Sequence, residues 1–384
     1  MVSQLRRIVS WIIGRLPSSK RSIVEVREQL SAIQTQISRL QECVDARCAH
    51  LEVGQYNVEK SLRAEILTNR EQSSIMAWSN YRKDGESSVD AHKRFFLSLP
   101  KATGSMRVIQ RGCASLLSEF AQIAQQHNLQ YWADFGTLLG CVRHRGFIPW
   151  DDDVDLGMMR EDIDKLLTML REDAALCARY RAVLVYDPYV CCRQLRFRYA
   201  NNSNPCFLDI FFYDYAPDLT PEQQQSFVSL RKDLQQELRS QTFFNTWLDR
   251  GYVEQGGEYT AEIEQIFQSF QKKAVNQGLV VSKSCARNVV YGLDNVDAEN
   301  LYIARCAEMF PVKMATFEDF SVAIPQLSED ILERVYGDIY QLPSDIITHF
   351  RHVDCESLHS SHTDDVIEQD IRSNPYAIDC GRLE

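Results

Sequence analysis

The segment YWADFGTLLGCVRHRGFIPWDDDVDLGMM, from Tyr131 to Met159, decides the fold. It begins with a short apolar run that predicts a strand, passes a turn at Gly136 and Thr137, and continues with apolar residues at helical spacing. A loop then leads to a second strand-like run, and four carboxylates precede or begin it: Asp151, Asp152, Asp153 and Asp155. This order of strand, turn, short helix, loop and acidic strand predicts an α+β fold with a carboxylate cluster beside a turn.

The acidic run has the pattern of a metal site. If Val154 and Leu156 face a core, the two-residue period of a strand places Asp153 and Asp155 together on the opposite face. Like charges this close raise at least one pKa unless a cation binds. Mg²⁺ and Mn²⁺ prefer oxygen ligands and serve phosphoryl and nucleotidyl transfer. An acidic run can also be a solvated loop or a helix start, but apolar residues on both sides favour the metal site here.

Several blocks of the sequence resemble the LicD family, which includes fukutin and the fukutin-related protein. The first block is GTLLG from Gly136 to Gly140, followed by RHRGFIPWDDDVD from Arg143 to Asp155. Two later blocks are FLDIF from Phe207 to Phe211 and YGDIYQLP from Tyr336 to Pro343. The resemblance implies a nucleotidyltransferase-like core, in which a short mixed sheet is flanked by helices.

The same resemblance implies the roles of individual residues. Gly136 and Thr137 would form the turn on the phosphate side, and Asp151 would be an additional acid in the substrate site. Backbone N–H groups at the start of a helix suit this role, because they offer donors and the positive end of the helix dipole. The metal ligands, which are also the catalytic residues, would be Asp153, Asp155 and Asp209.

Two further observations concern side chains near these acids. Arg143 and Arg145 flank the loop before the acidic run and could bind a donor phosphate bidentately, or pair with surface carboxylates. We predict a substrate-binding role for Arg143. Asp209 lies among apolar residues, where an unpaired carboxylate is costly, so a metal ion or a donor should lie next to it. It could also act as a general base toward an acceptor hydroxyl.

A seven-residue repeat precedes this region. Between Ile23 and Val58, apolar residues recur at the two core positions of a heptad, which predicts a coiled coil that joins copies of the chain. The alternative is a single amphipathic helix packed on its own catalytic domain. With the remaining composition, we predict a basic amphipathic segment at 1–20, a coiled-coil helix at 21–71, a connector at 72–98, a catalytic domain at 99–360 with a helical insertion at about 220–273, and a polar tail at 361–384.

Charge and composition restrict the partners and the compartment. The net charge of -11, from 42 basic and 53 acidic side chains, argues against broad nucleic-acid binding. The apolar stretch near the N-terminus is too short to span a bilayer, but its basic flanks suit peripheral contact with a membrane surface. The twelve cysteines include no CxxC pair, and we interpret them as small buried side chains in a reducing compartment. These features predict a cytoplasmic protein, peripheral to a membrane at most.

The predicted reaction combines the metal site with the family resemblance. We expect a Mg²⁺- or Mn²⁺-dependent phosphotransferase that moves phosphocholine or a polyol phosphate from a CDP-linked donor to a hydroxyl of a glycan. The metal site follows from residues and spacing, whereas the donor and the acceptor are what the resemblance implies. Three alternatives stay open: a nucleotidyltransferase that consumes a nucleoside triphosphate, a glycosyltransferase with an Asp-x-Asp metal motif, and a coiled-coil membrane scaffold with a degenerate enzyme domain.

Overall fold

The computed structural model describes residues 7–8, 11, 20–295, 301–341 and 361–376. The chain divides into two compact units, Met1–Asn80 and Tyr81–Glu384. Most of the basic segment predicted at residues 1–20 lies outside the described residues. Within the described part, no helix combines the length and the apolar character that crossing a membrane requires.

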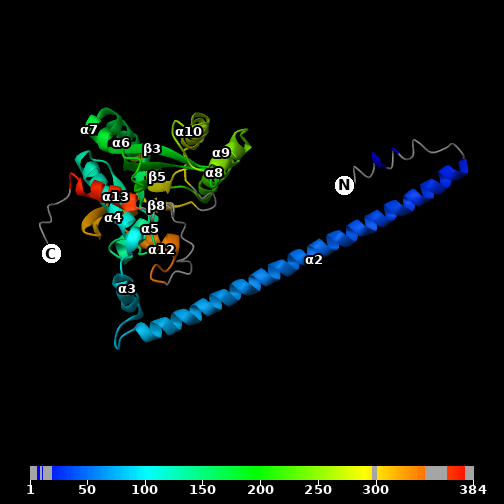
Figure 1. Ribbon diagram of the computed structural model, residues 1–384, viewed down its shortest axis with the longest axis horizontal. Coiled ribbons are helices and arrows are strands. Elements are labelled where there is room, and N and C mark those ends of the chain that lie inside the picture. Colours follow the sequence, from blue (N-terminus) through cyan, green and yellow to red (C-terminus); the bar gives the residue numbers. More distant parts are fainter. Residues whose placement is uncertain (1–6, 9–10, 12–19, 296–300, 342–360, 377–384) are drawn as a thin grey trace. The chain divides into compact units, whose positions relative to one another are not determined.

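The first unit is dominated by one helix, α2 (Lys20–Tyr81), which is 62 residues long (Figure 1). It contains the whole heptad repeat. Ile33, Leu40, Val44 and Val58 on the apolar seam are 49 to 68% exposed. An isolated helix gains little from exposed apolar side chains, because most helical stability in proteins comes from covering an apolar face.

The connector predicted at residues 72–98 is largely helical. Its first ten residues are the last turns of α2, and Ser88–Ser98 form a second helix, α3. The Ser87 hydroxyl caps α3 by accepting a hydrogen bond from Asp90 N, and Phe96 is buried against the catalytic unit. The polar composition of this segment therefore reflects two exposed helix faces and one short turn.

The second unit is built on a mixed eight-stranded sheet. Neighbouring strands follow the order β1, β2, β5, β4, β3, β6, and β7 pairs with β5 and β8 with β7. Among the strand pairs of this sheet that the structure describes, only β2–β5 is parallel. The strands are β1 (Tyr131–Ala133), β2 (Asp155–Met159), β3 (Tyr180–Asp187), β4 (Cys192–Tyr199), β5 (Phe207–Ala216), β6 (Val253–Glu254), β7 (Asn288–Tyr291) and β8 (Ile303–Arg305). The α+β class with a mixed sheet flanked by helices is confirmed.

Strand β4 carries arginines at alternating positions but lies inside the sheet, between β3 and β5. The arginines are tolerated inside the sheet because carboxylates meet them. Arg196 pairs with Asp209, and Arg193 pairs with Asp294 and Glu264.

One face of the sheet carries the main core. Helices α4 (Gly104–Gln126) and α6 (Arg160–Glu172) supply its apolar cover, and Phe120 of α4 contacts both Tyr131 and Phe197 at 5.1 to 5.3 Å between ring centroids. Leu156 and Ile210 belong to this buried core. Because side chains alternate along strands, Asp155 and Asp209 lie on the other face. Helix α5 (Phe135–Arg143) follows β1.

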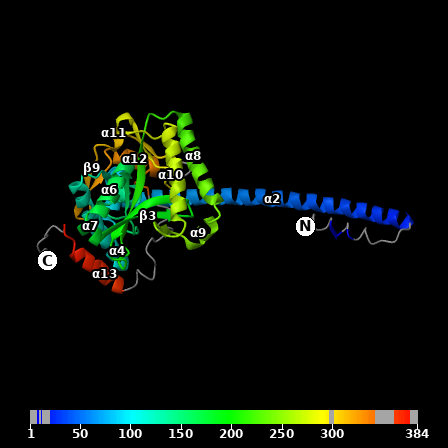
Figure 2. The same cartoon turned by 90° about the horizontal axis from the view of Figure 1, so that it is seen from above.

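The range predicted for a helical insertion contains α8 (Pro221–Ser240), α9 (Phe244–Arg250) and α10 (Thr260–Asn276). Figure 2 shows α8 and α10 side by side. Thr220 and Gln223 form a capping box at the start of α8. Shorter elements complete the unit: α7 (Ala174–Arg179), a 3₁₀ turn (Lys283–Cys285), α11 (Cys306–Met309), the hairpin β9 (Lys313–Phe317) and β10 (Phe320–Ile324), and α12 (Ser328–Tyr336).

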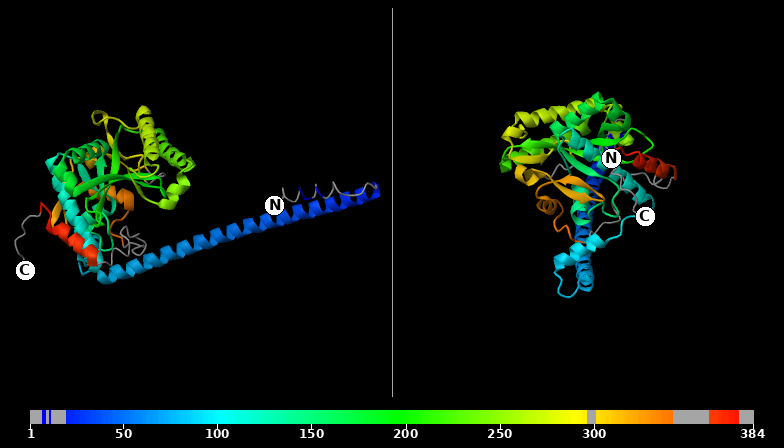
Figure 3. Two further views of the ribbon diagram at one scale, coloured as in Figure 1. Left: turned by 45° about the horizontal axis from the view of Figure 1, so that its top comes forward. Right: turned by 90° about the vertical axis from the view of Figure 1, so that its left-hand side faces the viewer.

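The polar tail predicted at residues 361–384 contains a packed helix. Helix α13 (Ser361–Arg372) lies along α4 (Figure 3), with Ile367 fully buried between them. A Cβ atom at Gly112 would be 2.7 Å from the Ile367 side chain and 2.4 Å from Cys206 Sγ, so only glycine permits this approach. Arg111 pairs with Glu368, and Asn204 Nδ2 donates to Asp370 at 2.8 Å. One buried isoleucine thus anchors an otherwise polar helix.

Candidate active site

The acidic run forms a compact group before β2. One carboxylate oxygen from each of Asp151, Asp152 and Asp153 lies within 4.8 Å of the others. Asp151 and Asp152 are buried, and Asp153 is half-buried. Such a group of oxygen donors suits Mg²⁺ or Mn²⁺. Among the described residues, Asp151, Asp152 and Asp153 are the acids whose ligand atoms lie close enough to one another to bind one ion jointly.

Asp155 and Asp209 extend this group onto the sheet. They are register partners on the parallel strands β2 and β5, and Asp209 N donates to Val154 O at 2.9 Å. Burial raises the pKa of Asp155 well above its ordinary value, and the charges of Asp153 and Asp209 raise it further. A bound divalent cation would reverse this effect. The structure therefore brings the three predicted ligands to one corner of the sheet.

Asp209 has a cationic partner that we did not assign from the sequence. Arg196 donates to both of its carboxylate oxygens at 2.8 and 2.9 Å, and Gln194 Nε2 donates to Oδ2 at 2.7 Å. The Arg196 guanidinium also lies 3.7 Å from the ring centre of Phe207. Oδ2 accepts two of these hydrogen bonds and Oδ1 accepts one, so metal ligation by Asp209 would use the second lone pair of Oδ1. The alternation of arginines on this strand was the sequence signal.

The Gly-Thr turn lies directly against the acids. A Cβ atom at Gly136 would be 2.9 Å from Asp151 Oδ2, so glycine makes room for that carboxylate. Thr137 is buried, and its hydroxyl accepts a hydrogen bond from Asp155 N at 2.8 Å. The first helical hydrogen bond of α5 joins Leu138 N to Asp134 O, so the N–H groups of Gly136 and Thr137 precede the helical ladder. The role of these N–H groups toward a phosphate stays a prediction.

Asp134 completes the turn. Its carboxylate accepts hydrogen bonds from Phe135 N at 3.0 Å and from the Tyr213 hydroxyl at 2.6 Å. Burial raises the pKa of Asp134 to about 6, although the bond from Tyr213 opposes the shift. Phe135 has a φ of 38°, a left-handed conformation that is costly for a bulky residue. We infer that the two hydrogen bonds to Asp134 help to hold this strained turn in place.

The structure argues against the substrate-binding role predicted for Arg143. This side chain is buried; it donates to Ile339 O and to His144 Nε2, both at 2.9 Å, and lies 4.3 Å from the ring centre of Phe96. Arg143 therefore joins α5 to α3 and to the segment after α12. The sequence placed it in the loop, but the helix continues through this residue and turns its side chain inward.

Residues of other elements contact the loop between α5 and the acids, and these residues were not identified from the sequence. Glu318, at the turn of the β9–β10 hairpin, donates its backbone N–H to Arg145 O at 2.9 Å. Its carboxylate pairs with Arg107 at 2.7 Å and with Lys101. From α4, Gln110 Nε2 donates to Asp151 O at 2.8 Å. These contacts hold the acidic run in one conformation.

Tyr336, at the end of α12, also lies near the acids. Desolvation by neighbouring protein atoms raises the pKa of its hydroxyl although 45% of the residue is exposed, and the charges of Asp155 and Asp134 add to this shift. Tyr336 begins one of the blocks that resemble the family. Asp338 follows α12 and is exposed.

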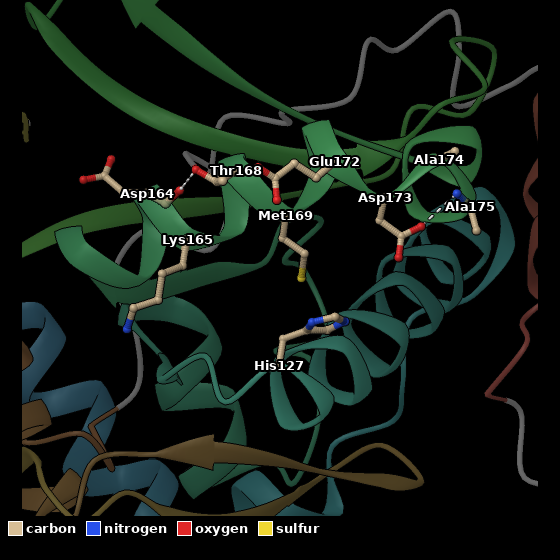
Figure 4. Close-up of a pocket in the computed structure, with 9 residues that line it drawn as sticks. All are labelled: His127, Asp164, Lys165, Thr168, Met169, Glu172, Asp173, Ala174 and Ala175. Atoms are coloured by element: carbon tan, nitrogen blue, oxygen red, sulfur yellow. Dashed lines mark hydrogen bonds between the residues drawn. The ribbon is translucent and has the colours of Figure 1, made fainter.

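One cavity in the described part of the chain lies away from this chemistry. Its volume is about 840 Å³, and Figure 4 shows its lining residues, which include His127, Lys165 and Glu172. His127 precedes β1, and Tyr131 at the start of β1 pairs with Met158 near the end of β2. The cavity is therefore at the opposite end of these strands from Asp155.

Comparison with known proteins places the site in a family. Residues 128–249 match the model of the LicD/FKTN/FKRP nucleotidyltransferase domain. This range contains the Gly-Thr turn, the acidic run, Asp209 and Arg196.

Individual relatives match this chain over parts of their length. The lipopolysaccharide cholinephosphotransferase LicD of Haemophilus influenzae is 27% identical over 156 residues, which are 38% of this chain and 56% of that protein. The human ribitol 5-phosphate transferase FKRP is 42% identical over 55 residues, 13% of this chain and 11% of that protein. The mouse ribitol-5-phosphate transferase FKTN is 29% identical over 106 residues, 28% of this chain and 22% of that protein. The chain thus spans about half the length of LicD and less of the other two.

Proposed function

Because this chain belongs to the LicD family, we propose that it transfers a phospho-alcohol group, phosphocholine or a polyol phosphate, from a CDP-linked donor to a glycan hydroxyl. The observation that carries the proposal is the pairing of Asp155 with Asp209 on parallel strands, beside the acidic run and the Gly-Thr turn. The names of the matched relatives, a cholinephosphotransferase and two ribitol phosphate transferases, support the class of group transferred.

The carboxylates fit a divalent cation, because burial and then the charges of neighbouring acids raise the pKa of Asp155, and because oxygen ligands suit Mg²⁺ or Mn²⁺. We propose Asp153, Asp155 and Asp209 as the ligands, with Asp151 and Asp152 beside them. A cation bound there would neutralise the phosphate charge of the donor.

The protein's own groups would orient the reactants. The N–H groups of Gly136 and Thr137 lie at the start of α5, where the helix dipole favours an anion, so they suit the donor phosphates. Thr137 also fixes the backbone at Asp155, and Arg196 with Gln194 fixes the Asp209 carboxylate. This preorganisation favours transfer because the acids need no rearrangement during the reaction.

The donor is tested by following phosphorus. With CDP-choline, CDP-ribitol or CDP-glycerol, Mg²⁺ and a mixture of glycans, we expect release of CMP and transfer of the alcohol-side phosphate to the glycan. A label in that phosphate should appear in the glycan, and EDTA should stop the transfer. A nucleotidyltransferase would instead release pyrophosphate from a triphosphate, and a glycosyltransferase would transfer no phosphorus. Recovery of the labelled phosphate in the nucleotide product would contradict the proposal.

We also propose that α2 joins copies of the chain through its heptad seam. Removal of residues 1–80, which end at the boundary between the two units, should abolish self-association and leave transfer to a soluble acceptor unchanged. The seam residues Ile33, Leu40 and Val44 are exposed and would be covered by a second helix.

Light scattering of the full chain and of residues 81–384 measures this effect. A matched full-length variant, Ile33→Lys with Leu40→Lys, should dissociate as well, because it places charges in the seam without shortening the chain. Equal mass per particle for all three proteins would show that α2 is not the oligomerisation element. A cytoplasmic location and peripheral contact with a membrane stay predictions.

A further inference from the structure

A second cavity, of about 520 Å³, lies beside the strained turn. Its walls include the aromatic side chains of Trp132, Phe135 and Tyr302, with Met309 and Val335 as aliphatic neighbours. This volume is typical of small-ligand sites, which are mostly apolar with a few placed polar groups.

The cavity is on the face of the sheet that carries the acids. Trp132 pairs with Gly157, and Gly157 is two residues from Asp155 on β2, so both project on the same face. The indole covers Gly157 so closely that a Cβ atom there would be 2.3 Å from Trp132 Nε1. Two residues along a strand correspond to about 7 Å. A ligand whose phosphate reaches the carboxylates can therefore place a ring in the cavity.

The Phe135 ring lines the cavity, and Phe135 directly precedes the Gly-Thr turn. It lies 5.5 Å from both Phe211 and Tyr291 and 6.0 Å from Tyr302, all in edge-to-face geometry. Phe211 is two residues from Asp209 on β5, on the same face. Phe135, which has the left-handed conformation, thus contributes its ring to an aromatic wall next to the Gly-Thr turn.

Polar groups line the same cavity. The Asp134 carboxylate accepts one hydrogen bond at each oxygen, which leaves a lone pair on each for a hydroxyl or amino group of a ligand. Arg334 also lines the cavity and is held by Glu308 at 2.9 Å. Flat aromatic walls with hydrogen-bond acceptors at one side match a nucleoside better than they match a polyol, which has no ring to stack.

We propose that this cavity binds the base and ribose of the donor nucleotide, while the turn and the carboxylates bind its phosphates. The inference rests on the proposed function, in which the donor is a nucleotide. The base stacks on the aromatic wall, and Asp134 accepts a hydrogen bond from the nucleoside.

Calorimetric titration of the full chain tests this assignment, with Mg²⁺ present and with CMP and ribose 5-phosphate as the two ligands. Ribose 5-phosphate has the same phosphate and sugar but no base. The wild-type protein should bind CMP at least about tenfold more tightly. Tyr302→Ala should reduce that preference about tenfold, and Val335→Trp, which fills the cavity, should remove it. The control Glu333→Trp, exposed on the same helix, should bind both ligands as the wild type does.

The outcomes separate this inference from the proposed function. Equal binding of CMP and ribose 5-phosphate by the wild type, or a CMP preference that survives both cavity variants, would overturn the nucleoside site even if a CDP-linked donor is consumed. Loss of the preference in both variants would establish the site even if no CDP-linked alcohol is consumed, in which case the reaction proposed above fails alone.

Discussion

Replacing Asp155 with Asn is expected to lower the rate of phospho-alcohol transfer at least about a hundredfold, because changes even beside metal ligands cost about ten- to a hundredfold. The same substitution should raise the free energy of unfolding of the metal-free protein. Burial and the charges of Asp153 and Asp209 raise the pKa of Asp155 in the folded state. Folding is therefore favoured most while this carboxyl is protonated, and the advantage is lost as pH rises through its folded pKa. Asparagine does not ionise, so the variant does not lose this stability as pH rises.

Initial rates with Mg²⁺ and thermal unfolding in EDTA at pH 5 and pH 8 test both effects. The stabilisation by Asp155→Asn should be larger at pH 8 than at pH 5, because the raised folded pKa makes ionisation of the wild-type carboxyl increasingly unfavourable to folding as pH rises. Asp164→Asn, an exposed carboxylate on α6, is the matched control and should change neither rate nor stability. Full activity in Asp155→Asn would refute the proposed mechanism.

Replacing Asp294 with Asn should lower the free energy of unfolding by about 3–5 kcal/mol, the usual cost of breaking a buried ion pair. Asp294 is buried and pairs with two arginines, Arg160 and Arg193. Each guanidinium also lies within 5 Å of the ring centre of Phe212. Asparagine would leave two buried cations with less compensation.

The pH dependence has the opposite sign to that of Asp155. Burial opposes ionisation of Asp294, but Arg160 and Arg193 outweigh it and hold its pKa below the ordinary value. Its contribution is complete above the unfolded pKa, near 4, and is lost as pH falls toward the lower folded value. Urea unfolding at pH 7 and pH 3 should show a smaller difference between wild type and Asp294→Asn at pH 3. Asp233→Asn, at an exposed position on α8, is the control and should have the same free energy of unfolding as the wild type. The same free energy of unfolding for Asp294→Asn would show that its ion pairs contribute nothing to stability.

The sequence predicted the parts of the site that depend on local spacing. The alternation around Val154 placed the acids beside the sheet, and the turn at Gly136 lies against them as expected. Arg143 could not be assigned, because the direction of its side chain depends on one more residue of helix and on a partner at Ile339, far along the chain. Arg196 was missed for a related reason: only the strand order shows that it faces Asp209.

The helices at residues 88–98 and 361–372 were not predicted, because both segments have a polar average composition. Residues 88–98 and 361–372 become ordered through one or two buried side chains each, Phe96 and Ile367, and the rest of each helix faces solvent. An average over composition cannot detect a single anchor. The heptad repeat in α2 was visible because its period recurs over many turns.

The packing of α13 on α4 has a consequence for the order in which the chain folds during synthesis. The ribosome completes α4 before the sheet, whereas Ile367, which fills the notch at Gly112, is synthesised after the last strand of the sheet. A chain that is still being translated therefore cannot fill this notch with Ile367 until α13 has emerged. The packing of α13 on α4 is for this reason a late step in the folding of the second unit.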